Sequence, residues 1–236
     1  MYRAKACGIK AMGALLHGGN DGSCRPDTHP AKLLWVAHPR HSRRFQSVVT
    51  LLAMSDHMDA FREWVGTIRE DVETLEAIID SESIAQDARQ FAAAALNYLV
   101  TRMDLVPDWE ESIGVLDDVM VIRICVEFAS QRGLDEGLTD AKHIVAVGRL
   151  VNESQRIDEF LGAELGADLR KYVARLVDSS ARGRGVSTIL ENPAERKKLY
   201  EEVAGDLKRM PPAPFTNPES TTVKFKSYLQ HKLSKS

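Results

Sequence analysis

Apolar residues recur at the spacing of a helix in the stretch that begins at Met58. They are Met58, Phe61, Val65, Ile68, Val72, Leu75 and Ile79. Steps that alternate between three and four residues place these side chains along one face of a helix. Charged residues fill the rest of the helix surface, so we expect the apolar face to pack against other helices. A bundle needs only this stripe, whereas a coiled-coil dimer would need more repeats of it.

Two further helices are expected, one on each side of Pro107. Ser83 and Gln86 have the spacing of a capping box, which predicts a helix that runs to about Met103. Pro107 cannot continue a helix and restricts the residue before it, so the chain must turn there. A third helix is predicted over about 115–131. Because its sequence is apolar nearly all round, we expect it to be the central and most buried helix.

The remaining helices are recognised by their ends. Thr139 is expected to cap a fourth helix that runs to about Leu161, and a fifth amphipathic helix covers about 165–176. Asn192-Pro193 is typical of a helix start and predicts a last helix. The ARGRG stretch at 181–185 is interpreted as an exposed or flexible turn, and no strand pattern is convincing. The chain is therefore predicted to be all-α: a helical bundle of about five to six helices with a Pro/Gly-broken helical hairpin at its centre.

The charge of the chain changes sign near residue 53. Residues 1–53 carry eight Lys and Arg and two acids, a net charge of +6, so the rest carries −9 to give the total of −3. A body this acidic is a poor general binder of nucleic acid, so no nucleic-acid partner is expected. The first 53 residues show no sustained helical period. We interpret 1–53 as a disordered or mis-assigned N-terminal extension, with Met54 or Met58 as the alternative start.

Residues 210–236 are predicted to be a Pro-rich and then basic C-terminal tail. Three prolines within 211–214 are expected to end the folded part, which leaves residues 54–209 as the helical domain. Apolar residues then recur every four positions from Phe225 onward, among lysines. A basic amphipathic helix of this kind fits an anionic membrane surface or a protein partner. A solvated tail is the alternative interpretation.

The candidate site lies in the stretch from Tyr98 to Asp118, YLVTRMDLVPDWEESIGVLDD. Its four aspartates are Asp104, Asp108, Asp117 and Asp118. At a turn and at a helix start, carboxylates accept hydrogen bonds from free backbone amides, so capping explains all four. The alternative is that they converge on a cation. Carboxylates without nearby His or Cys favour a hard ion, Mg²⁺, Mn²⁺ or Ca²⁺, either structural or in support of hydrolysis.

The same residues resemble the YkvA-like family, a small helical domain of unknown function found widely in bacteria. The resemblance rests on Tyr98-Leu99, Asp104-Leu105-Val106-Pro107-Asp108-Trp109 and Gly114-Val115-Leu116-Asp117-Asp118, and its core covers residues 91–130. It implies a helical hairpin and marks the aspartates, and it implies no known reaction. Some relatives resemble membrane-associated proteins. Glu110 and Glu111 stand where the family usually has an apolar residue and Pro, which argues against membrane insertion of this turn.

Other patterns of catalysis or nucleotide binding are missing from the sequence. GxxxxGK[ST], GxSxG and HExxH do not occur, and His57 and His143 are isolated. Cys125 falls in the most apolar predicted helix and is interpreted as a core residue. Three widely spaced cysteines make no disulfide framework, which favours a reducing compartment such as the cytoplasm. No uncharged apolar run reaches the length of about 18 residues that a transmembrane helix needs.

Together these patterns favour a non-enzymatic helical interaction module in the cytoplasm. Its predicted partner is an unknown protein or, through the basic tail, an anionic membrane surface. The alternative is a divalent-cation-dependent enzyme or sensor that uses Asp104, Asp108, Asp117 and Asp118.

Overall fold

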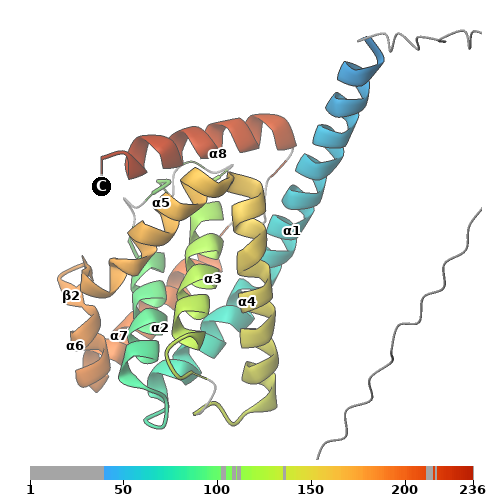
Figure 1. Ribbon diagram of the computed structural model, residues 1–236. Helices are drawn as coiled ribbons and strands as arrows, with labels where there is room; N and C mark the ends of the chain where they lie inside the picture. The colour runs from blue at the N-terminus through green and yellow to red at the C-terminus, as the bar shows by residue number, and fades with distance from the viewer. Residues whose placement is uncertain are drawn as a thin grey trace, which may run out of the picture. The chain divides into compact units, whose positions relative to one another are not determined.

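The protein is an all-α bundle in the computed structural model (Figure 1), which describes residues 40–101, 105–107, 110, 113–134, 137–210, 215 and 217–235, with side chains from residue 56 onward. The described elements in chain order are α1 (Arg40–Asp80), α2 (Gln86–Leu99), α3 (Leu116–Ser130), α4 (Ala141–Leu161), α5 (Ala163–Ala174), the 3-10 helix η1 (Leu176–Asp178), the strands β1 (Ser180–Ala181) and β2 (Arg184–Gly185), α6 (Val186–Glu191), α7 (Pro193–Arg209) and α8 (Pro218–Leu233).

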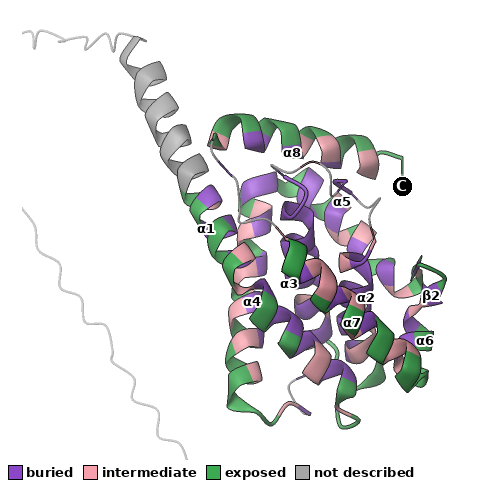
Figure 2. Cartoon of the chain, turned by 180° about the vertical axis from the view of Figure 1, so that it is seen from behind, coloured by how far each residue is buried: buried purple, intermediate pink, exposed green. Residues whose placement is uncertain are grey.

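Helix α3 is the central helix, as its nearly uniform apolar sequence predicts. It contacts α1, α2, α4 and α5, and α2 packs on it most extensively. Every residue of α3 from Leu116 to Val126 is buried, and Figure 2 shows buried residues gathered in the interior of the bundle. The polar residues in this stretch, Asp117, Asp118 and Arg123, are buried with it. Because a buried charge must be compensated by partners, these three side chains indicate where specific contacts are concentrated.

Helix α1 carries the apolar stripe predicted from Met58 onward. Met58, Phe61, Leu75 and Ile79 are fully buried in the core, which confirms the predicted face. The helix begins at Arg40, earlier than the predicted start of the helical domain at residue 54. A helix propagates at low cost once it has nucleated, so its backbone extends beyond the clear apolar period. Residues 1–39 lie outside the described residues, and their interpretation stays a prediction.

The start of α2 differs from the predicted capping box. The Ser83 hydroxyl does not cap the helix, which begins after Ala85 without a side-chain cap. Instead it donates to the carbonyl oxygen of Gly137 at 3.1 Å. A Cβ at Gly137 would lie 2.6 Å from Ile84 Cγ1, so the two loops approach too closely for any other residue. Tertiary contact with the loop before α4 therefore replaces the local cap.

Three other helix starts are capped by asparagine or aspartate side chains, and one of them is α8, where Asn217 Oδ1 accepts from the amide of Ser220 at 3.1 Å. Asp140, not Thr139, caps α4, because its carboxylate accepts from the amide of Lys142 at 2.8 Å. The predicted cap of α7 is confirmed, since Asn192 Oδ1 accepts from the amide of Ala194 at 3.0 Å. These caps satisfy amides that have no partner within the helix.

The ARGRG stretch forms a β-hairpin: Arg182 and Gly183 are the exposed turn that was predicted, but Ala181 and Arg184 beside them are buried and paired as strands, which was not predicted. Arg182 and Gly183 both have positive φ, 51° and 78°, the geometry of a two-residue type I′ turn. The next residue, Arg184, is buried, and its Nη2 donates to Glu202 of α7 at 2.8 Å. Its carbonyl oxygen accepts from Asn97 Nδ2 at 3.1 Å. The hairpin thus connects α2 to α7.

The basic tail forms α8 and packs on the bundle. This differs from the prediction that the folded part ends before the three prolines. Phe225 and Leu229 are fully buried, and α8 contacts α1 and α5 (Figure 1). The apolar face that suggested membrane binding is therefore covered by protein. Membrane binding through this face stays a prediction, and it would require α8 to leave α1 and α5.

None of the helices in the described ranges combines the length and the apolar character that crossing a membrane requires.

Candidate functional site

The Asp117 carboxylate holds the turn that contains Pro107. Asp117 is the second residue of α3 and is fully buried. Its Oδ2 atom accepts from the Tyr98 hydroxyl at 2.6 Å and from the backbone amide of Val106 at 3.1 Å. The amide of Leu105 donates to the same Tyr98 hydroxyl at 3.2 Å. One carboxylate therefore joins the end of α2, the turn and the start of α3.

This arrangement follows from the burial of the turn. Leu105 and Val106 are buried, and a buried amide without an acceptor costs about 1–3 kcal/mol. Asp117 and Tyr98 supply those acceptors. As the capping prediction expects, the Asp117 carboxylate accepts a hydrogen bond from a free backbone amide. This amide lies in the turn and not in the helix of Asp117 itself. Asp118 is buried in the same first turn of α3, where the positive end of the helix dipole favours a carboxylate.

The metal hypothesis is not decided by these contacts. Asp104 and Asp108 lie outside the described residues, so their distances to Asp117 and Asp118 are not defined. Within the described ranges, no group of three or more His, Cys, Asp or Glu side chains is arranged to hold a metal ion. Binding of Mg²⁺, Mn²⁺ or Ca²⁺ by Asp104, Asp108, Asp117 and Asp118 stays a prediction.

Glu110 connects the motif turn to the C-terminal helix. Its carboxylate accepts from the Tyr228 hydroxyl at 2.7 Å and forms an ion pair with Lys224. The Lys224 contact, followed by the Tyr228 hydrogen bond, lowers the pKa of the Glu110 carboxyl. Its backbone carbonyl accepts from the amides of Ile113 and Gly114, each at 2.8 Å. An acid at this position, where the YkvA-like pattern has an apolar residue, thus binds α8.

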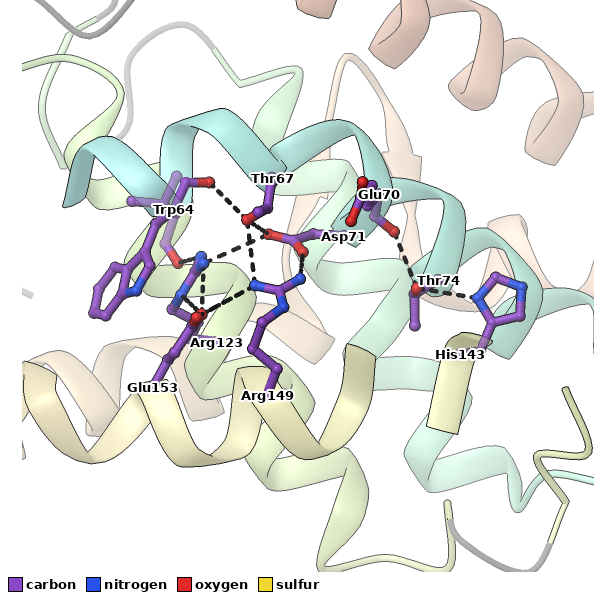
Figure 3. Close-up of polar contacts among 10 residues, drawn as sticks. Trp64, Thr67, Glu70, Asp71, Thr74, Arg123, His143, Arg149 and Glu153 are labelled. Carbon is purple, nitrogen blue, oxygen red and sulfur yellow. Dashed lines mark hydrogen bonds and ion pairs between the residues drawn. The ribbon is translucent and has the colours of Figure 1, made fainter. Parts of the chain in front are cut away.

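A second polar site lies between α1, α3 and α4 (Figure 3). We call it the charge cluster, and it consists of Asp71, Arg123, Arg149 and Glu153. Arg123 Nε donates to Glu153 Oε2 at 2.8 Å, and Arg123 Nη1 donates to the carbonyl oxygen of Val119 at 2.9 Å. Arg149 binds Asp71 and lies 3.2 Å from Glu153 Oε2. Two cations and two anions balance one another and join three helices.

Burial sets the electrostatics of the charge cluster. Asp71 and Arg123 are fully buried, and the Trp64 ring covers the Arg123 guanidinium at 4.2 Å. Arg123 Nη2 lies 2.7 Å from Glu153 Oε2 without the alignment of a hydrogen bond, so this contact is an ion pair. Burial lowers the pKa of Arg123 to about 10, which leaves it charged at neutral pH. Burial also raises the pKa of Asp71, although Arg123 and Arg149 oppose that shift.

An open groove borders the charge cluster, and we call it the α4 groove. It lies between α1 and the first half of α4 and has a volume of about 430 Å³. Its wall is mainly apolar and is formed by Glu70, Thr74, Ala141, Lys142, Val145, Ala146 and Arg149. Val145, which lines it, is 72% exposed, and its chain neighbour Ile144 is 50% exposed. The α4 groove is therefore a hollow whose apolar surface faces solvent.

Charges surround the α4 groove. Lys142 forms an ion pair with Glu73 across α4 and α1. The Thr74 hydroxyl lies 3.0 Å from His143 Nδ1 (Figure 3). Among the described residues, the Glu70 carboxylate has no ion-pair partner, although it is exposed on the same edge. The groove thus combines an apolar floor with one acid that is available to a cation.

The sequence contains a signal for the charge cluster, although none of its four residues was predicted to be a site residue. Trp64 and Ile78 widen the buried face of α1 beside Ile68 and Leu75, and Asp71 falls within this wider face. Arg123 likewise interrupts the uniformly buried stretch of α3. A charge inside an apolar stripe requires a counter-charge from another element. The sequence cannot show which element supplies it.

The isolated reactive residues are placed as structural residues. Cys125 is fully buried, which raises the pKa of its thiol and confirms its prediction as a core residue. His57 is partly buried, with its ring 5.5 Å from the Phe160 ring. Burial, followed by the charge of Arg156, lowers the pKa of His57.

Comparisons with known proteins give no match: no protein-family model, no curated protein and no solved structure matches this chain. The resemblance to the YkvA-like family stays a prediction that rests on the motif residues.

Proposed function

We propose that this protein is a non-enzymatic interaction module that binds a helix of a partner protein in the α4 groove. The observation that supports it most directly is the exposure of Val145, which lines that groove, and of its chain neighbour Ile144. In the described part of the chain, the other exposed large apolar side chain is Val223 on α8. Neighbouring exposed apolar side chains beside a hollow are typical of an interaction site, whereas single ones are common on any surface.

The outer face of α4 suits a helix as the partner. Ala141, Val145 and Gly148 follow one another at helical spacing on an exposed face. A Cβ at Gly148 would meet no atom within 4 Å, so this face is open. Small residues on one helix let the backbone of another come close, and the partner side chain can then fill the hollow. This is the helix-in-groove mode of recognition.

Charge defines the partner further. Glu70 lies at the edge of the groove without an ion pair among the described residues, and residues 54–236 carry a net charge of −9 by the count above. A basic partner would therefore approach faster and be oriented by Glu70. The proposed partner segment is an amphipathic helix with an aliphatic side chain for the groove and a Lys or Arg opposite Glu70.

The test uses two matched variants of the full chain. A displayed library of amphipathic helical peptides is selected against the parent protein, and the affinities of the selected peptides are measured by fluorescence anisotropy. Val145→Asp places a charge at the groove, whereas Val223→Asp places the same charge on an equally helical but distant position. We expect Val145→Asp to weaken binding about tenfold or more and Val223→Asp to leave it unchanged.

A third variant tests the charge argument. Glu70→Gln is expected to weaken the binding of basic peptides and to reduce the salt dependence of their affinity. Selected peptides that bind Val145→Asp as well as the parent would disprove the proposal, and so would a library that yields no binder.

A further inference from the structure

Helix α1 is much longer than α4, which packs beside it. It runs without a break from Arg40 to Asp80, 41 residues, whereas α4 has 21 residues (Figure 1). At about 1.5 Å per residue, α1 is about 60 Å long and α4 about 30 Å. Asp56 pairs with Arg156 close to the end of α4. Most of the helical segment 40–55, which we call the α1 arm, therefore extends past the end of α4.

The sequence of the α1 arm is basic and amphipathic. Phe45, Val49 and Leu52 are spaced as residues on one face of a helix, and Arg40 and Arg44 are one helical turn apart. The arm contains three arginines and no acid, and the first turn of α1 likewise has none. Arginines at a helix start are repelled by the positive end of the helix dipole. Carboxylates from outside the arm would relieve this repulsion.

Carboxylates of this kind lie on α1 beside the α4 groove. Glu63 and Glu70 are two helical turns apart on an exposed side of α1, and Glu70 lines the groove. Neither forms an ion pair with another described residue. A Cβ at Gly66, between them, would meet no atom within 4 Å, so this side of α1 is open. Together with Val145 in the groove, this surface complements the arm in charge and in apolar character.

The α1 arm cannot reach the α4 groove of its own copy. Ser47, near the middle of the arm, and Glu70 are 23 residues apart in one continuous helix, from 47 to 70. That separation is about 35 Å along the helix axis. No movement of an intact helix shortens it, because the arm and the edge of the groove belong to the same rigid element. The groove of a second copy is not restricted in this way.

We propose that the α1 arm of one copy of this chain binds in the α4 groove of a second copy. The apolar face of the arm packs on Val145, and the arginines of the arm pair with Glu63 and Glu70. A twofold axis across α1 makes both contacts at once, so the assembly closes as a dimer. This inference rests on the proposed function, for which it names the partner.

The experiment reverses the charges of the arm and of the groove in the full-length chain. The arm variant is Arg40→Glu/Arg44→Glu, and the groove variant is Glu63→Arg/Glu70→Arg. In either variant alone, both contacts of the dimer would join like charges. In an equimolar mixture, the arm of each variant meets a groove of opposite charge in the other. Analytical ultracentrifugation gives the dimer Kd of each sample, and native mass spectrometry identifies the mixed dimer by its mass.

Each variant alone is expected to dimerise at least about tenfold more weakly than the parent, and the mixture to form a mixed dimer within about threefold of the parental Kd. Acids favour a helix start, so the arm variant does not act by unfolding the arm. Val145→Asp should also weaken the dimer about tenfold. The control Glu191→Arg/Glu201→Arg makes the same charge change at exposed acids of α6 and α7, and it should keep the parental Kd.

Three results would overturn the dimer. They are a parent chain that stays monomeric at every concentration, a mixture that dimerises no more tightly than its components, and a dimer that Val145→Asp leaves intact. In the first case, binding of vesicles that contain phosphatidylserine, lost in the arm variant alone, would assign the arm to a membrane. The proposed function would still stand if peptides selected on the parent are rejected by Val145→Asp, so the two failures are distinguishable.

Discussion

The Tyr98 hydroxyl donates to the Asp117 carboxylate across 2.6 Å, and this single bond links the end of α2 to the start of α3. Both groups also serve the turn between the helices, because Leu105 donates to the hydroxyl and Val106 to the carboxylate. The residues that define the sequence motif thus act together to hold one buried turn.

Removal of the Tyr98 hydroxyl should destabilise the protein. Tyr98→Phe leaves the amide of Leu105 without its acceptor and Asp117 without one donor, so we expect a loss of about 1–3 kcal/mol in the free energy of unfolding, measured in urea. Tyr200→Phe is the control, because that hydroxyl makes only long contacts, 3.3 Å to Asp80 Oδ1 and 3.5 Å to the Glu76 carbonyl. Equal losses in the two variants would contradict the role given to Tyr98.

Divalent cations should not stabilise the protein specifically if Asp117 serves the turn. We expect the thermal unfolding midpoint in Mg²⁺, Mn²⁺ or Ca²⁺ to equal the midpoint in a monovalent salt of the same ionic strength. Asp117→Asn should then lower the midpoint equally with and without the cation. A ligand that binds only the native state raises its stability. A rise with one cation in the parent that disappears in Asp117→Asn would therefore show a metal site, completed by Asp104, Asp108 or Asp118.

Truncation of Phe225 should lower the free energy of unfolding as much as truncation of a core residue does. Phe225 is fully buried, so Phe225→Ala is expected to lower the free energy of unfolding by about 3–5 kcal/mol. Val223→Ala, two residues earlier and 60% exposed, should change it by less than about 0.5 kcal/mol. Denaturation in guanidinium chloride gives both values. A small effect of Phe225→Ala would mean that the tail is solvated, which was the alternative interpretation of its sequence.

The charge cluster predicts strong coupling between Asp71 and Arg123. Arg123→Met leaves Asp71 buried with only Arg149 as a counter-charge, and removal of one partner of a buried pair costs about 3–5 kcal/mol. The double variant Asp71→Asn/Arg123→Met should be more stable than Arg123→Met by about 1–3 kcal/mol, because no unpaired charge remains. A double-mutant cycle of unfolding free energies measures this. Strictly additive effects would show that the two residues do not depend on each other.

His57 should make the protein less stable in acid. Burial and the charge of Arg156 lower the pKa of His57, while Asp56 and Glu159 oppose the shift and Lys226 adds to it. The folded state therefore binds this proton less readily than the unfolded state. Its contribution to stability is complete above the unfolded pKa of about 6.5 and is lost as the pH falls from there through the folded pKa.

A substitution isolates that contribution. His57→Phe keeps an aromatic ring beside Phe61 and Phe160 and cannot titrate, so the slope of unfolding free energy against pH below about 6.5 should become shallower. An unchanged slope in His57→Phe would assign the acid sensitivity to other groups.

The helices were largely predictable because their signals are local. The stripe on α1, the uniform apolar sequence of α3 and the Asn192-Pro193 start of α7 each specify an element without knowledge of the rest. Ser83 and Thr139 show the limit of such signals. Each has the chemistry of a cap, but Ser83 binds the neighbouring loop and Asp140 caps α4 in place of Thr139. For Ser83, tertiary contact with the loop before α4 replaces the local cap.

The sequence by itself determined that the chain is all-α and that α3 lies at the centre, because helical periodicity and apolar content are properties of each segment. It also located the motif whose Asp117 holds the turn. Only the tertiary structure decided that the basic tail is a packed helix and that Asp71, Arg123, Arg149 and Glu153 meet between three helices. It also decided that Val145 lies beside a groove. These features depend on which faces of distant helices come together, and burial and electrostatic interaction act between neighbours in space.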